Sequence, residues 1–202
     1  MSTSKELSAL IQQVNVQKKE RVVFKFNLYT IISTWFCLGL IPFMPGTIAS
    51  ISVYPIYKFM ISSSNSYMEL QISTCIVAAL LFVIGWFAVR KFETTTMSHD
   101  HKSIVIDEVI GQLLVIGLSF KWLHKLSIKI SSYTTFNSLD TAFIIALIAF
   151  RFFDIKKPFL IRYIDRNMKG AMGVILDDVM AALFAAGSIF IAYKVYDAFT
   201  YS

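Results

Sequence analysis

The sequence predicts an all-α protein, a small polytopic transmembrane helical bundle with an interfacial N-terminal helix. Hydrophobic residues make up 56% of the 202-residue chain and charged residues only 16%, whereas soluble domains average about 45–50% and about 25%. The apolar residues are gathered in long runs, and most basic residues lie between these runs. This composition excludes an intrinsically disordered chain and a collagen-like or low-complexity chain.

The N-terminal region is predicted to lie outside the bilayer core. Residues 1–21 form a polar extension without a hydrophobic signal core, so no cleaved signal peptide is expected. The remainder, residues 22–199, is predicted to be one membrane-embedded domain. Its first apolar run, Val22–Ile41, is followed by Pro42-Phe43-Met44-Pro45-Gly46-Thr47. Because irregular backbone is not tolerated against lipid, we place this turn at an interface or in a protein-lined cleft. Val22–Ile41 then becomes a helix in, or dipping into, the membrane surface.

Five later runs are candidate membrane crossings. A crossing needs about 20 apolar residues, or about 17 at the short end. Three runs meet this length easily. The runs at residues 48–61 and 142–153 are short, and the run at residues 142–153 needs its flank from Leu139 to cross. If the run at residues 48–61 is only re-entrant, the number of crossings falls by one and every later segment changes sides. The candidates are Ile48–Ile61, Ile72–Val89, Ile104–Leu123, Ala142–Phe153 and Val174–Val195.

The distribution of Lys and Arg predicts the orientation of the bundle. The net charge is +6, which suits either a nucleic-acid-binding protein or basic cytoplasmic loops, and the hydropathy favours the loops. The side that holds the N-terminus and the loops at residues 90–103 and 151–173 carries 14 of the 19 Lys and Arg residues, and the other side carries 5. The positive-inside rule makes the first side cytoplasmic. Five crossings then leave the C-terminus outside.

Five acidic residues are predicted to lie in one layer on the cytoplasmic side. Asp107 and Glu108 open the third crossing, Asp154 ends the fourth, and Asp177 and Asp178 open the fifth. Solvated helix ends are the simplest explanation, because acids near a helix N-terminus gain about 0.3–1 kcal/mol from the helix dipole. That explanation fails for Asp154, which lies at a C-terminal end. Crowded carboxylates repel one another, and a divalent cation removes the repulsion. Oxygen ligands favour Mg²⁺ or Mn²⁺, so we expect all five carboxylates to ligate or support a metal.

Basic and backbone groups near this layer are candidates for phosphate binding. Arg151, Lys157 and Arg162 follow or end the fourth crossing, and the segment Phe159–Asn167 has the pattern of an interfacial amphipathic helix. Its alternative role is to anchor the chain to anionic lipid. Gly46-Thr47 opens the first crossing, where free N–H groups can bind phosphate, or where a simple turn and N-cap would suffice.

A short polar loop also lies next to the acidic layer. It contains His99, Asp100 and His101. These residues suit either general acid–base catalysis or a solvated loop.

Four sequence blocks together resemble the phosphatidylglycerophosphatase A family. They are Pro45-Gly46-Thr47, then Ile106-Asp107-Glu108 with Gly111-Gln112, then Phe150-Arg151-x-x-Asp154-x-x-Lys157-Pro158, and then Gly170-x-x-Gly173-x-x-x-Asp177-Asp178. The resemblance covers about residues 22–195. It implies a Mg²⁺-dependent, multi-pass phosphatase of the bacterial inner membrane that converts phosphatidylglycerophosphate to phosphatidylglycerol and inorganic phosphate. The chain departs from the family pattern at Gly170-Ala171 and Ile48-Ala49-Ser50, which affects backbone fit and not the carboxylates.

Two alternatives to this function remain open at the level of sequence. Membrane-embedded acids also build pathways for divalent cations or protons, although neither an internal repeat nor a midplane acid supports a transporter here. The substrate of a phosphatase could also be another lipid phosphate, such as phosphatidic acid. A metal-activated water and an aspartyl-phosphate intermediate are both compatible with these residues. The expected partners are the lipid substrate and the bilayer and not a nucleic acid, and the pattern predicts no particular oligomeric state.

Overall fold

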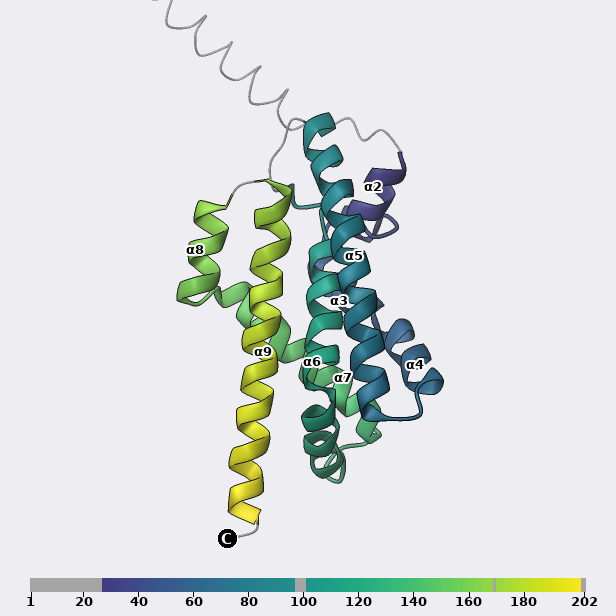
Figure 1. The fold of residues 1–202 in the computed structure, drawn as a ribbon, viewed down its shortest axis with the longest axis vertical. Coiled ribbons are helices and arrows are strands. Elements are labelled where there is room, and N and C mark those ends of the chain that lie inside the picture. Colours follow the sequence, from purple (N-terminus) through teal and green to yellow (C-terminus); the bar gives the residue numbers. More distant parts are fainter. Residues whose placement is uncertain (1–26, 97–100, 169, 201–202) are drawn as a thin grey trace, which may run out of the picture.

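The computed structural model describes residues 27–96, 101–168 and 170–200. Within these ranges the chain consists of helices and connecting turns and contains no strand, which confirms the all-α prediction. Figure 1 shows the long helices α5, α6 and α9 running along the long axis of the molecule. The elements in chain order are α2 (Leu28–Ser33), η1 (Leu38–Leu40), α3 (Pro45–Ser52), α4 (Tyr54–Ser63), α5 (Tyr67–Thr96), α6 (Ile106–Ser131), α7 (Ser138–Lys156), α8 (Phe159–Asn167) and α9 (Ala171–Thr200).

Helix α6 is the centre of the fold. It packs against α5, α7 and α9, and its start also contacts α3. Gly111 allows close approach to two of these helices, because a Cβ atom at this position would overlap the ring of Phe150 on α7 and meet the carbonyl oxygen of Asp178 on α9 at 3.3 Å. Since Asp107 and Glu108 lie one turn before Gly111, this contact also brings the acidic ends of three helices together.

Helices α5 and α9 are each long and apolar enough to cross a membrane. Each has 30 residues, which corresponds to about 45 Å and exceeds the roughly 30 Å of a bilayer core. On α5, one row of large apolar side chains points away from the protein core, at spacings of three or four residues. It consists of Ile72, Ile76, Leu80, Val83 and Phe87. A helix that is apolar on its outer face as well as its inner face is typical of contact with lipid.

The predicted crossings at Ile72–Val89 and Val174–Val195 lie inside α5 and α9. The run Ile104–Leu123 falls on α6, which begins at Ile106, and Ala142–Phe153 falls within α7.

The predicted crossing Ile48–Ile61 is two helices and not one, which corrects the sequence analysis. Helix α3 ends at Ser52 and α4 begins at Tyr54, with Pro55 in its first turn. A proline is tolerated in the first turn of a helix but not in its interior, so it marks a boundary here. The first turns of α4 are joined to the first turn of α7. The hydroxyl of Tyr54 donates to Asp140 at 2.6 Å, and Lys58 pairs with the same carboxylate at 2.9 Å.

The prediction of one interfacial helix over Val22–Ile41 is also wrong, because the described part of this segment contains two short helices. Helix α2 has six residues and ends at Ser33. After the C-cap residue Thr34, the residues Trp35, Phe36 and Cys37 all have positive φ angles, and the short 3₁₀ helix η1 follows. Left-handed backbone at three successive residues cannot continue an α-helix. The part of the prediction at residues 22–26, like most of the polar extension, lies outside the described residues.

Helix α8 matches the predicted amphipathic segment Phe159–Asn167. It packs against α9, with Ile161 fully buried and with Leu160 and Tyr163 exposed. It lies at the same end of the molecule as the beginning of α9 (Figure 1).

Candidate active site

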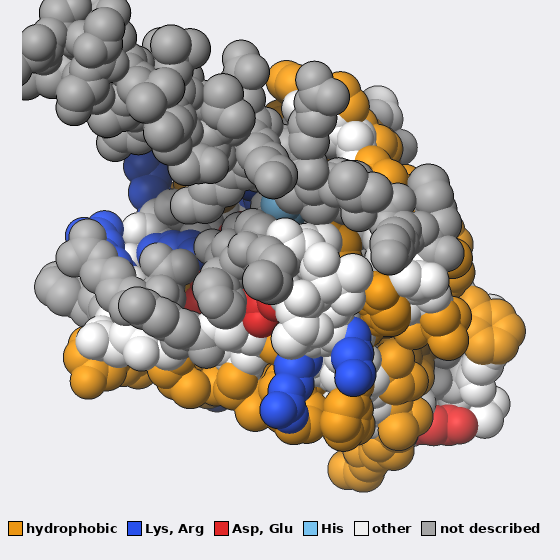
Figure 2. All heavy atoms as spheres, turned by 90° about the horizontal axis from the view of Figure 1, so that it is seen from above, with side chains coloured by type: hydrophobic (Ala, Val, Ile, Leu, Met, Phe, Trp, Pro, Cys, Tyr) orange, Lys and Arg blue, Asp and Glu red, His pale blue; other side chains and the backbone are white. Residues whose placement is uncertain are grey.

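A cavity of about 740 Å³ opens at one end of the helix bundle. Figure 2 looks onto this end and shows acidic side chains in a hollow with Lys and Arg side chains beside it. The residues that line the cavity are Met44, Pro45, Gly46, Thr47, His101, Lys102, Ile104, Asp107, Glu108, Arg151, Asp154, Ile155, Lys157, Met168, Gly170, Gly173, Val174, Asp177 and Asp178. All five predicted carboxylates are therefore in one cavity.

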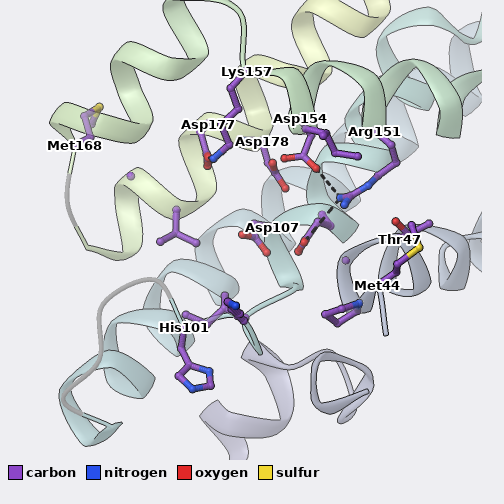
Figure 3. A pocket seen from close by; sticks show the side chains of 18 of the residues that line it. Met44, Thr47, His101, Asp107, Arg151, Asp154, Lys157, Met168, Asp177 and Asp178 are labelled. Carbon is purple, nitrogen blue, oxygen red and sulfur yellow. Dashed lines mark hydrogen bonds and ion pairs between the residues drawn. The ribbon is translucent and has the colours of Figure 1, made fainter. Parts of the chain in front are cut away.

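Three helices bring these carboxylates together. Asp107 and Glu108 are in the first turn of α6, and Asp154 is in the last turn of α7, which runs in the opposite direction. Asp177 and Asp178 lie in the second turn of α9. Figure 3 shows Asp107 and Asp178 on facing helices, with their carboxyl groups turned toward a common space.

Asp107, Glu108 and Asp178 form the candidate metal-binding group, and we refer to them as the carboxylate trio. Each offers an oxygen atom, and these atoms all lie within 4.8 Å of one another. Three oxygens of the trio, Asp107 Oδ1, Glu108 Oε2 and Asp178 Oδ2, are buried and have no hydrogen-bond partner among the described residues. Buried polar atoms without partners are costly, and a bound cation would satisfy them.

The other two carboxylates are held by cations of α7. Arg151 Nη1 lies 2.6 Å from Asp154 Oδ2 and 3.9 Å from Glu108 Oε1, and Lys157 Nζ donates to Asp177 Oδ2 at 2.6 Å. Lys157 is the C-cap of α7 and has a φ angle of 42°. A non-glycine residue in this region is strained, so the pairing is maintained against a local backbone cost. The five predicted carboxylates thus divide into the trio, of which Glu108 also pairs with Arg151, and two further carboxylates that are each 2.6 Å from a cation.

Gly46 serves a steric purpose that the sequence does not reveal. A Cβ atom at this position would overlap the carboxylate of Glu108 and lie 3.2 Å from Arg151 Nη1. Helix α3 therefore begins directly against the trio, and Thr47 also lines the cavity. The predicted role of Gly46 and Thr47 in phosphate binding stays a prediction.

Two predicted residues lie apart from the carboxylates. Figure 3 shows the ring of His101 turned away from them, and its Nδ1 accepts a hydrogen bond from the backbone N–H of Ser103 at 3.2 Å. Arg162 is exposed on α8 and is not part of the cavity lining. His99 and Asp100 lie outside the described residues.

Several cavity residues were missed by the sequence analysis. Met44, Lys102 and Met168 line the cavity, but no spacing rule connects them with the acids. Gln112, which the second sequence block contains and which does not line the cavity, is fully buried one turn after Glu108, and both polar atoms of its side chain lack a hydrogen-bond partner among the described residues. The spacing of Arg151 and Asp154 was a usable signal, because residues three apart in a helix face each other.

Comparisons with known proteins agree with this geometry. The chain is 31% identical over 168 residues to a phosphatidylglycerophosphatase A of Haemophilus influenzae, covering 81% of this chain and 88% of the relative. It is 29% identical over 164 residues to the protein of the same name from Escherichia coli, covering 81% and 83%.

A third relative carries a different name. A Bacteroides thetaiotaomicron protein, provisionally named a phosphatidylinositol-3-phosphatase, is 30% identical over 166 residues, covering 78% of this chain and 89% of the relative. No solved structure matches the chain. The sequence model of the phosphatidylglycerophosphatase A family matches residues 31–193, a span that contains every residue of the cavity, and the chain therefore belongs to this family of phosphatases.

Proposed function

We propose that this protein hydrolyses the phosphomonoester of phosphatidylglycerophosphate and releases phosphatidylglycerol and inorganic phosphate. The observation that carries the proposal is the carboxylate trio with its unpartnered oxygens, in a cavity that also holds Arg151 and Lys157. A phosphatase must collect negative charge from a phosphate, and a bound cation beside fixed Lys and Arg side chains meets that need.

The residues of the trio fit Mg²⁺. They offer only oxygen ligands, which Mg²⁺ prefers, and they come from α6 and α9, whose positions are fixed by packing. When bound, Mg²⁺ would neutralise charge on the phosphate and lower the pKa of a water molecule that attacks it. We assign the trio as metal ligands and keep Asp154 and Asp177 as supporting carboxylates.

The ion-paired residues fix the geometry around the trio. Arg151 bridges Asp154 and Glu108, so it fixes the carboxylate of a proposed ligand relative to α7. Lys157 joins the end of α7 to α9 through Asp177. Both cations line the cavity, and we assign them to hold the non-bridging oxygens of the phosphate. Gly46 and Thr47 contribute backbone N–H groups on the α3 side, and Arg162 contributes positive charge from α8.

We also propose a multi-pass position in the bacterial inner membrane, with residues 22–199 as one embedded domain and the cavity on the cytoplasmic side. Helices α5 and α9 support this, and α6 packs against both of them while α7 packs against α6 and α9. The cavity lies at the end where α6 and α9 begin and α7 ends, which is the side with most of the Lys and Arg residues of the described part of the chain. The lipid tails could then stay in the bilayer while the headgroup enters the cavity.

Another lipid phosphate is the second candidate substrate. The name of the Bacteroides relative refers to an inositol lipid with a phosphomonoester. Both headgroups present a phosphomonoester on a polyol, so the same trio could serve either substrate. Phosphatidic acid is a third lipid of this type, and it carries its monoester directly on the diacylglycerol.

The deciding experiment measures phosphate release by the purified protein from these three lipids, each with Mg²⁺ and with EDTA. We expect phosphatidylglycerophosphate to give the highest kcat/KM, EDTA to abolish turnover, and Asp107→Asn to lower kcat by at least about 100-fold. Asp140→Asn is the matched control, because Asp140 lies at the far end of α7 and should retain activity. Cation flux into liposomes without phosphate release would instead support the transporter alternative, and undiminished turnover in EDTA would refute the metal.

A further inference from the structure

The cavity contains a Lys that the proposed chemistry does not yet use. Three Lys or Arg residues line it among the described residues, namely Lys102, Arg151 and Lys157. Arg151 and Lys157 are each 2.6 Å from a carboxylate oxygen. Lys102 is exposed and has no ion pair within the described part of the chain. It is therefore the cavity cation whose charge is most available to a ligand.

The backbone that carries Lys102 is held in place. The N–H of Ile104 donates to the carbonyl of His101 at 2.8 Å, which closes a turn around Lys102 and Ser103. The N–H of Val105 donates to the carbonyl of Ser33 at 2.9 Å, and this bond ties the turn to α2. A Cβ atom on Gly39 would overlap the carbonyl of Ser103, so η1 also lies directly against it. Lys102 therefore projects from a fixed turn that leads into α6.

This turn and Lys157 lie on different sides of the trio. In Figure 3, His101, which precedes Lys102, and Lys157 are on opposite sides of Asp107. The cavity has a volume of about 740 Å³, within the range of about 300–1,000 Å³ for ligand pockets, and a single phosphate would leave much of it empty. A headgroup with two separated phosphates would use both sides.

We propose that Lys102 binds the phosphodiester of the substrate while the trio acts on the phosphomonoester. This inference rests on the proposed function and adds a second anion subsite to it. Phosphatidylglycerophosphate carries both groups, joined through a glycerol, and phosphatidic acid carries only the monoester. Lys102 is therefore a specificity-determining residue that favours lipids in which a polyol separates the two phosphates.

The test compares Lys102→Ala with the wild type on phosphatidylglycerophosphate and phosphatidic acid of the same acyl chains in mixed micelles. We expect Lys102→Ala to raise KM for the two-phosphate lipid by about tenfold and to change kcat less than about twofold. The reason is that the lost contact stabilises the bound substrate and the transition state equally. KM for phosphatidic acid should stay within about twofold of wild type; if phosphatidic acid is not turned over, its inhibition constant replaces KM. Lys102→Arg should retain most of the affinity.

Lys91→Ala is the charge control, since Lys91 is exposed near the end of α5 and does not line the cavity. It should leave both lipids unchanged. Equal effects of Lys102→Ala on both lipids, equal effects of Lys91→Ala and Lys102→Ala, or no effect on the two-phosphate lipid would each overturn the subsite. A wild-type protein that releases no phosphate from phosphatidylglycerophosphate would refute the proposed function itself, which is a separate result.

Discussion

Replacing Asp178 with Asn should stabilise the metal-free protein while it destroys metal binding. The ligand atoms of the trio lie within 4.8 Å of one another. Two unit charges at that separation repel by about 3.5 kcal/mol at an effective dielectric constant of about 20. Asn has nearly the same shape as Asp but no charge, so Asp178→Asn removes two of the three repulsions in the trio. Protonation already relieves part of this repulsion, and we expect a net gain of about 2 kcal/mol.

The assay is thermal unfolding of the detergent-solubilised protein in EDTA and in Mg²⁺. A gain of about 2 kcal/mol corresponds to a rise of about 4–8 °C for a chain of this length. Wild-type protein should gain about 2.7 kcal/mol at a Mg²⁺ concentration 100 times Kd, and Asp178→Asn should gain far less. Asp140→Asn is the opposite control: this carboxylate is paired with Lys58 and Tyr54, so its loss should lower stability and leave the Mg²⁺ response intact. An Asp178→Asn protein with unchanged or lower stability in EDTA, and with the full Mg²⁺ response, would refute the reasoning.

Three further predictions concern the walls of the cavity. Gly46→Ala should displace the carboxylate of Glu108 and weaken Mg²⁺ binding by about 10–100-fold, measured by titration calorimetry; wild-type affinity would contradict the contact. Arg151→Gln should lower kcat by at least about 100-fold, because both carboxylate partners of the guanidinium lose their cation, and steady-state phosphate release measures this. Gly173→Ala should overlap the carbonyl of Met168, the residue that follows α8, and lower both activity and stability. Gly187→Ala on the same helix meets no atom within 4 Å and should be neutral or gain up to about 1 kcal/mol of stability; equal unfolding temperatures for the two variants would contradict the packing.

The acidic layer was predictable because it depends only on where helices begin and end. Asp107, Asp154 and Asp178 lie near the ends of apolar runs, and antiparallel helices bring such ends to one level. The sequence does not show which acids carry cation partners, because that depends on side-chain positions across helices. The Lys157–Asp177 pair joins residues 20 apart in the sequence. It also needs left-handed backbone at Lys157, at the end of α7, and the sequence has no glycine or asparagine at that position to indicate it.

The first third of the described chain was the hardest to predict. Pro55 gave a usable signal for the break between α3 and α4, since a proline inside a helical run usually marks a boundary. The break after α2 gave none, because Trp35, Phe36 and Cys37 are residue types that seldom adopt positive φ. Tertiary contacts favour this backbone instead: the indole N–H of Trp35 donates to the hydroxyl of Ser52 at 2.8 Å, and such contacts are not encoded in local propensity.

The most direct test of the central claim is a crystal structure of the protein soaked with Mn²⁺, which takes Mg²⁺-type oxygen sites and gives an anomalous signal. We predict an anomalous peak inside the cavity, bonded to carboxylate oxygens of Asp107, Glu108 and Asp178. An empty trio alongside a peak elsewhere, or carboxylates satisfied by protein groups alone, would contradict the assignment of these three residues as the metal site.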